Sequence, residues 1–199
     1  MPALCETFFR SERRFQGVSL RRLYELALVV GGVLLLALCA KIKVPIPYSP
    51  VPINMGTFAV LTIGAGYGLR LGVLTLLVYM AIGASGLDVF ANSSAENNGW
   101  AYMFGPTGGY LAGFVLAAAV LGLFAHMGWD RKVWRMGLAM LVGNVVIYLP
   151  GLLWLHTFTN GWAQTLEWGL WPFLFGDFLK LLLAALLLPL LWTVRSRQR

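Results

Sequence analysis

The sequence is poor in charged residues, and acidic residues are the scarcest. Of its 199 residues only 12% are charged, with eight Asp and Glu against fifteen Lys and Arg. A soluble domain of this size carries about 25%. The chain also lacks a long polar linker that would mark a boundary between two domains. This scarcity excludes an ordinary soluble globular protein and indicates one membrane-embedded domain.

Cysteine and histidine are also scarce, at two residues each. Cys5 and Cys39 are predicted to lie on opposite sides of the membrane, so we expect no disulfide between them. The chain has no His-Glu-x-x-His motif and no Cys/His cluster, so the sequence predicts no metal site. No short apolar core with a small-residue cleavage site occurs near the N-terminus, and we expect no cleaved signal peptide.

Apolar residues make up 59% of the chain and gather in six segments that we interpret as membrane spans. The connector after the first span has four prolines in eight residues, and we expect it to be stiff and extended. The sequence thus predicts an all-α integral membrane protein with six transmembrane helices and two polar, aromatic loops. The expected spans are 23–40, 53–69, 71–86, 105–126, 136–156 and 171–192, and the loops are 87–104 and 157–169.

The basic residues indicate the orientation of these spans. Twelve of the fifteen fall on the side that holds both termini, Lys41 and Lys43 fall on the other, and Lys180 lies inside a span. The positive-inside rule therefore makes both termini cytoplasmic. This placement explains the net charge of +7 without nucleic-acid binding. We expect a basic segment at 1–22, a six-helix transmembrane domain at 23–194 and a basic tail at 195–199.

The last span carries two opposite charges in its outer half, Asp177 and Lys180. Residues three apart lie on one face of a helix, and the pair is ~9–14 Å below the outer surface when counted from Trp171. Because lipid does not solvate ions, this face must contact protein or a polar cavity. An internal salt bridge that fixes helix packing is one interpretation. We favour a polar ligand site.

The stretch Gly83-Ala-Ser-Gly86 resembles the nucleophile motif of rhomboid intramembrane proteases. Ser85 would need a histidine to accept its proton, and His156 is the plausible candidate. Ser85 ends its helix, however, whereas a buried nucleophile would need a helix N-terminus and hydrogen-bond donors around it. We therefore expect no enzyme activity and keep an intramembrane serine protease as the alternative from another class.

Five short stretches follow one another along the chain, and the ordered set is more specific for a family than any single stretch. They are Pro50–Ile53, Gly86–Ala91, Gly105–Phe114, Gly143–Tyr148 and Gly176–Lys180, the last followed by Ala184, Ala185 and Pro189. Together they resemble the BioY family, the biotin-specific substrate-binding (S) components of energy-coupling-factor (ECF) vitamin transporters. The resemblance covers about three quarters of the chain. Two positions depart from the family pattern: Gly56 stands where the family tends to have Gln, and Asp88 where it tends to have Pro.

The resemblance implies a multi-pass protein of the bacterial cytoplasmic (inner) membrane that captures biotin from outside, without catalytic chemistry, a cofactor or an ATP site of its own. It makes Asp177 and Lys180 ligand residues, since a carboxylate suits a ureido N–H and an ammonium suits the ureido oxygen or the valerate carboxylate. Asn92 has donors and an acceptor and suits either end of biotin. The matched stretches add further candidate ligand residues: Thr107, Gly108, Tyr110, Asn144 and Tyr148.

The resemblance also implies partners, namely a transmembrane coupling protein with paired ATPases. In the first span Ala27 and Gly31 stand four apart, a spacing that lets another helix approach closely, so we expect them to dock the coupling protein. We expect the loop 87–104 to act as a lid over the ligand. An S component for another small vitamin is the alternative within transport. The sequence leaves open whether the protein works alone, as a homo-oligomer or only with its partners.

Overall fold

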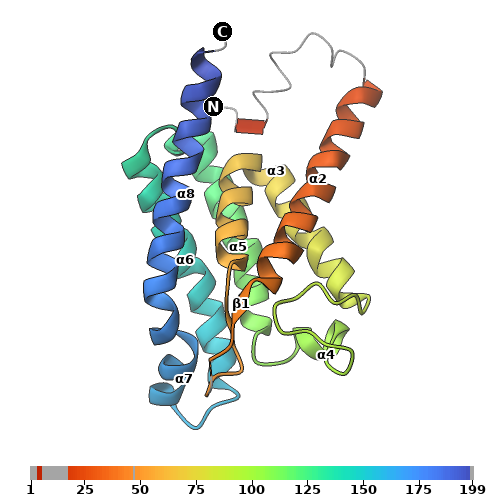
Figure 1. Cartoon of the computed structure of the whole chain (residues 1–199), viewed down its shortest axis with the longest axis vertical. Coiled ribbons are helices and arrows are strands. Elements are labelled where there is room, and N and C mark those ends of the chain that lie inside the picture. The colour runs from red at the N-terminus through yellow and green to blue at the C-terminus, as the bar shows by residue number, and fades with distance from the viewer. Residues whose placement is uncertain (1–3, 6–17, 47, 198–199) are drawn as a thin grey trace.

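The computed structural model describes residues 4–5, 18–46 and 48–197. Within them, five helices are long and apolar enough to cross a membrane, and they form the bundle shown in Figure 1. These helices are α2 (Val18–Lys41), α3 (Gly56–Ala84), α5 (Gly108–His126), α6 (Val133–His156) and α8 (Trp171–Arg197). Most of the expected basic segment 1–22, including Arg10, Arg13 and Arg14, and the tail residue Arg199 lie outside the described residues.

Helix α3 contains two of the six expected spans. Gly68 interrupts it with φ 77° and ψ 179°, a conformation that is essentially restricted to glycine. The chain folds back there, and the two arms come into close contact: a Cβ added to Gly72 would lie 3.3 Å from the Cα of Gly64. Figure 1 shows the two arms as a helical hairpin. Counting both arms, the described chain has six bundle helices, as expected, but the reversal is at Gly68 and not at Arg70, the residue between the expected spans 53–69 and 71–86.

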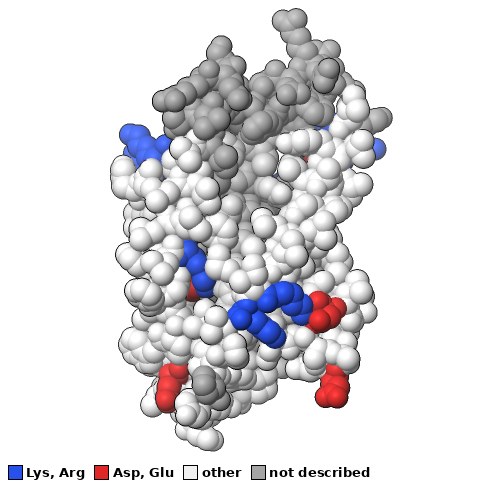
Figure 2. All heavy atoms as spheres, viewed as in Figure 1, with Lys and Arg blue, Asp and Glu red and all other residues white. Residues whose placement is uncertain are grey.

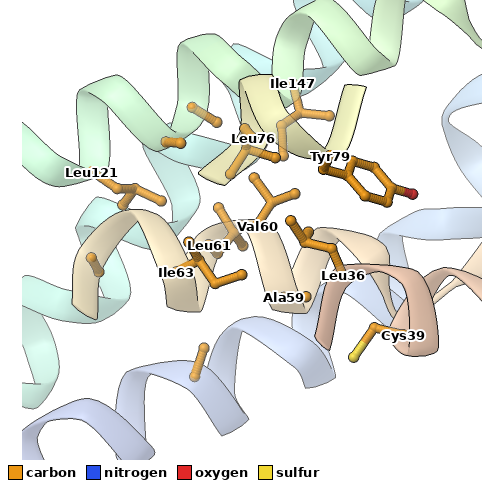
Figure 3. Packing of buried hydrophobic residues seen from close by; sticks show 14 of the residues in the cluster. Leu36, Cys39, Ala59, Val60, Leu61, Ile63, Leu76, Tyr79, Leu121 and Ile147 are labelled. Atoms are coloured by element: carbon orange, nitrogen blue, oxygen red, sulfur yellow. The ribbon is translucent and has the colours of Figure 1, made fainter. Parts of the chain in front are cut away.

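Small residues allow the central helices α3, α5 and α6 to pack closely. A Cβ added to Gly64 would lie 2.8 Å from the Cα of Ala118, and one added to Gly113 would lie 2.7 Å from the carbonyl oxygen of Ile147. Large apolar side chains fill the space beside these contacts, as Figure 3 shows for Leu76 and Leu121. This centre is therefore well packed, and α2 and α8 lie on either side of it (Figure 1).

The connectors have more structure than the sequence predicted. Strand β1 (Lys43–Val44) pairs antiparallel with β2 (Ile53–Asn54), so the proline-rich connector turns back on itself and the prediction of an extended connector is wrong. Its four prolines fall between the strands in sequence, where a missing N–H removes no ladder hydrogen bond. The two polar loops contain the short helices α4 (Gly99–Met103) and α7 (Trp162–Gly169), and the turn after α5 contains η2 (Trp129–Arg131).

The connectors gather at one end of the bundle, which we call the loop end. The β-strand pair, α4 and α7 lie there, whereas α2 begins and α8 ends at the opposite end (Figure 1). On the face shown in Figure 2, most charged side chains lie toward the two ends of the molecule, and the white region between them is interrupted on the left by one basic and one acidic side chain. Cys39 is buried, and no disulfide joins it to Cys5 in the described part of the chain.

Candidate ligand-binding site

A cavity lies inside the loop end, where several helices and connectors of the chain converge. It encloses about 630 Å³ of empty space, a figure that includes open solvent at its mouth. Ala40 at the end of α2 and Ala91 of the loop before α4 form part of its wall. Four tyrosines line it: Tyr79, Tyr102, Tyr110 and Tyr148. The other polar residues that line it are Asn54, Thr57, Thr107, Asp177 and Lys180.

Asp177 and Lys180 form a buried ion pair in the wall of this cavity. The Lys180 Nζ donates to Asp177 Oδ1 at 2.8 Å and to Thr57 Oγ1 at 3.3 Å, and the Thr57 hydroxyl donates to the same carboxylate oxygen at 3.2 Å. The Tyr148 hydroxyl donates to Asp177 Oδ2 at 2.5 Å. Asp177 is 4% exposed and Lys180 8%. The pairing offsets the desolvation cost that each charge would have alone.

The ion pair keeps hydrogen-bonding capacity for a ligand. An ammonium has three N–H donors and a carboxylate about four acceptor positions. Among the described residues, the contacts above use two of the donors of Lys180 and three of the acceptor positions of Asp177. Because both side chains line the cavity, the site offers one donor and one acceptor next to each other.

Three of the other predicted ligand residues also line the cavity: Thr107, Tyr110 and Tyr148. The Tyr110 hydroxyl donates to the carbonyl oxygen of Gly169 at 2.9 Å, and its ring meets that of Tyr148 edge to face at 6.2 Å between centroids. Gly108 is not part of the cavity wall. It begins α5, where a Cβ would collide with the Met103 carbonyl oxygen, so its observed role is close packing.

Asn92 and Asn144 do not line this cavity, and ligand contact by either stays a prediction. Asn92 is exposed; its Oδ1 accepts a hydrogen bond from Lys43 Nζ at 3.0 Å. Asn144 lies four residues before Tyr148, about 6 Å deeper along α6. It lines an apolar groove between α6 and α8, and its buried Oδ1 has no hydrogen-bond partner among the described residues.

Sequence reasoning missed several residues of the cavity wall, although some carried a signal. Asn54 and Thr57 are polar at the start of an apolar span, which a bilayer-facing helix would avoid. Tyr102 lines the cavity from α4, and its ring stacks on Phe90 at 5.0 Å between centroids. Phe173, one turn before Asp177, adds an apolar surface that no sequence pattern distinguished from an interfacial aromatic residue.

A second polar cluster ties the loop before α4 to the end of α2 and to β1. Lys41 Nζ donates to Asp88 Oδ1 at 2.6 Å, and the Ser93 hydroxyl donates to the same oxygen at 2.5 Å. The hydrogen bond from Lys41 is the largest cause that lowers the pKa of Asp88 below its ordinary value, followed by that from Ser93. Asp88 is therefore an anion at neutral pH.

The loop that carries this cluster is anchored by a buried aromatic side chain. Phe90 is 1% exposed, and a Cβ added to Gly83 would collide with its ring. Tyr79 meets Phe90 edge to face at 5.4 Å, and the Tyr79 hydroxyl donates to the Val89 carbonyl oxygen at 2.9 Å. The middle of the loop is thus fixed against α3, while 94–97 are exposed.

The two residues proposed for a serine protease each have other partners. The Ser85 hydroxyl donates to the Ile82 carbonyl oxygen at 2.7 Å. His156 Nδ1 lies 3.0 Å from Thr165 Oγ1, and its ring stacks on Trp162 at 4.1 Å between centroids. No hydrogen bond joins Ser85 to His156 in the part of the chain that the structure describes. The nucleophile and base that this chemistry requires are therefore not assembled.

The residues predicted to dock a partner lie on the outward face of α2. Ala27 and Gly31 are both exposed, and a Cβ added to Gly31 would meet no atom within 4 Å. The surface around them is apolar, with Leu23 62% and Leu34 58% exposed. A second helix has access to this face, and the docking role stays a prediction.

Comparisons with known proteins agree on one family. The family model described as the BioY family matches residues 11–197. The biotin transporter BioY of Thermotoga maritima is 32% identical over 160 residues, which cover 80% of this chain and 92% of that protein. The probable biotin transporter BioY of Pyrococcus horikoshii is 38% identical over 156 residues, which cover 78% and 88%.

A solved structure shares the fold. It is the crystal structure of the S-component for biotin from an ECF-type ABC transporter, with a TM-score of 0.78 and 21% sequence identity. The match covers 92% of this chain and 95% of that one. The two chains therefore have the same helical architecture over nearly their whole length.

Proposed function

The chain belongs to the BioY family, and from this premise we propose that it binds biotin as the S component of an ECF-type transporter. It is a multi-pass protein of the cytoplasmic membrane and a transport component, not an enzyme. The observation that carries the proposal is the buried Asp177–Lys180 pair, which lines a cavity and keeps hydrogen-bonding capacity for a ligand.

The head group of biotin fits that capacity. Biotin is a fused bicyclic urea, in which an N–H donor stands next to a carbonyl acceptor. The free acceptor position of Asp177 suits the ureido N–H, and the free donor of Lys180 suits the ureido oxygen. Hydrogen bonds to a charged partner are worth ~1.5–3 kcal/mol each, and a buried site protects them from competition with water.

The rest of the cavity suits the rest of the ligand. The thioether ring and the methylene chain of biotin are apolar, and Phe114, Ile147 and Phe173 line the cavity together with the tyrosine rings. With the ureido head against Asp177 on α8, we place the valerate tail toward the loop before α4 and the end of α2, where the side chains of Lys41 and Asp88 are 36% and 56% exposed. This orientation puts the carboxylate of biotin at the wetter end of the site.

Transport requires partners, and we propose the arrangement that the sequence predicts. A transmembrane coupling protein with paired ATPases docks on α2 around Ala27 and Gly31, whose spacing and exposure permit close helix approach. The loop end faces outward and both termini lie in the cytoplasm, so the domain at 23–194 is flanked by cytoplasmic basic segments at 1–22 and 195–199. The S component needs no cofactor, since uptake is driven by the ATPases.

Binding of radiolabelled biotin to the purified protein tests this function. We expect saturable binding that unlabelled biotin displaces and that other small vitamins, such as thiamine and riboflavin, leave unchanged. Displacement by one of those vitamins with no affinity for biotin would make the chain an S component of different specificity. Absence of binding to any of them would contradict the proposal.

A further inference from the structure

The cluster of Lys41, Asp88 and Ser93 lies at the rim of the cavity. Ala40 and Ala91 line the cavity. Lys41 directly follows Ala40 in the sequence, and Asp88 and Ser93 lie within three residues of Ala91. The hydrogen bonds from Lys41 and Ser93 to Asp88 therefore join the two segments that supply these wall residues. This cluster is a second charged site, separate in sequence and in contacts from the Asp177–Lys180 pair.

Lys43 adds another positive charge to the same rim. It pairs with Asn54 across the β-strands, where facing Cα atoms are ~4.5–5.5 Å apart, and Asn54 lines the cavity. Lys43 Nζ donates to Asn92 Oδ1 at 3.0 Å, in the same loop as Asp88. The rim therefore holds two lysines against one carboxylate, and Glu96 is the other acidic residue of this loop.

The Lys41–Asp88 ion pair at the rim can exchange partners more easily than the buried Asp177–Lys180 pair. The side chains of Lys41 and Asp88 are 36% and 56% exposed, whereas those of Lys180 and Asp177 are 9% and 5% exposed. Exposed ion pairs contribute little net free energy and are screened by salt. Another carboxylate that reaches Lys41 can therefore replace Asp88 at small cost.

We propose that Lys41 receives the carboxylate of biotin and that Asp88 occupies this position until the ligand arrives. The inference rests on the proposed function, because it takes the ligand to carry a carboxylate at the end of a flexible tail. Asp88 then acts as an internal competitor: it neutralises Lys41 in the free protein and sets how strongly the rim favours an anionic ligand over a neutral one. Ser93, which is buried and bonded to Asp88, positions the carboxylate for this contact.

The experiment compares biotin with biotinamide, which keeps the ureido head and the chain but has no charge. In Asp88→Asn we expect biotin to bind about two- to fivefold more tightly, the range that loss of an exposed competing ion pair gives, and biotinamide to bind unchanged. In Lys41→Met we expect the preference for biotin over biotinamide to disappear. Glu96→Gln is the matched control, because Glu96 is exposed in the same loop and should leave both affinities unchanged.

Salt gives a second readout of the same inference. The preference of the wild-type protein for biotin over biotinamide should fall as ionic strength rises from ~0.01 to 0.5 M, because an exposed charge contact is screened. Weaker binding of both ligands to Asp88→Asn would mean that Asp88 only holds the loop in place, and equal affinities in wild type and Asp88→Asn would mean that Asp88 does not compete. Either result would overturn the inference while biotin binding itself stands. If wild type bound neither ligand, the proposed function would fail instead.

Discussion

Replacing Asp177 by Asn is the sharpest perturbation of the candidate site. The change keeps the size of the side chain but removes the charge that pairs with Lys180 and accepts from Thr57 and Tyr148. It also converts a charge-assisted hydrogen bond to the ureido N–H into a neutral one. Such a bond is worth ~1.5–3 kcal/mol, so we expect the biotin affinity to fall roughly 10- to 100-fold.

The assay is titration of the purified variant with biotin, together with its thermal unfolding. The unfolding measurement is needed because Asp177→Asn leaves Lys180 as an unpaired buried cation. Breaking a buried ion pair destabilises the folded protein by ~3–5 kcal/mol. The double variant Asp177→Asn, Lys180→Met contains no unpaired charge and separates the two effects. We expect it to unfold at a higher temperature than the single variant and still to bind biotin poorly.

Ser85→Ala is the matched control for this experiment, since Ser85 bonds only to its own helix in the contacts described and should leave the affinity unchanged. Unchanged affinity in Asp177→Asn would refute the reasoning. The ion pair would then be a structural salt bridge that fixes α8 against α3 and α6, and the ligand would be held by other residues of the cavity.

Three further predictions concern the partner, the lid and the fold. Gly31→Trp should abolish co-purification with the coupling protein and leave biotin binding intact, whereas Leu123→Trp, exposed on α5 instead of α2, should preserve the complex; recovery of the complex with Gly31→Trp would refute the docking site. Deleting 94–97 should speed biotin dissociation several-fold and change association little, because a closed loop acts mainly on the off-rate; equal dissociation rates would make the loop a connector only. Gly68→Ala should lower the unfolding temperature, because φ 77° with ψ 179° costs an alanine ~1–3 kcal/mol. Gly137→Ala, whose added Cβ has 4.0 Å to its nearest neighbour, should not.

The helices of this fold were predictable because the bilayer imposes a simple rule on sequence. An apolar segment of sufficient length is a span, and this rule identifies every long helix of the bundle. The rule does not predict features that depend on the backbone conformation of single residues, such as turns and strand pairing. The hairpin of α3 turns at Gly68, whose conformation no composition signal marks, and Arg70 attracted the prediction because charge was the visible feature. The pairing of Lys43 with Asn54 likewise depends on how the proline-rich connector turns.

The site was predictable to the extent that polar residues stand out against an apolar background. Asp177 and Lys180 carried that signal inside a membrane span. Tyr79, Tyr102 and Phe173 carried none, because aromatic residues near span ends are common in all membrane proteins. Asn92 and Asn144 stand in or beside stretches that resemble the family but do not line the cavity, so ligand contact by either stays a prediction.

A structure of the protein with biotin bound tests the central claim most directly. The account predicts a ureido N–H within hydrogen-bond distance of the Asp177 carboxylate, ~2.7–3.2 Å between N and O, and the ureido oxygen at the same distance from Lys180 Nζ. The valerate carboxylate should lie at the rim, toward Lys41. A biotin molecule that turns its carboxylate to Lys180 and its ureido group to the rim would contradict the account.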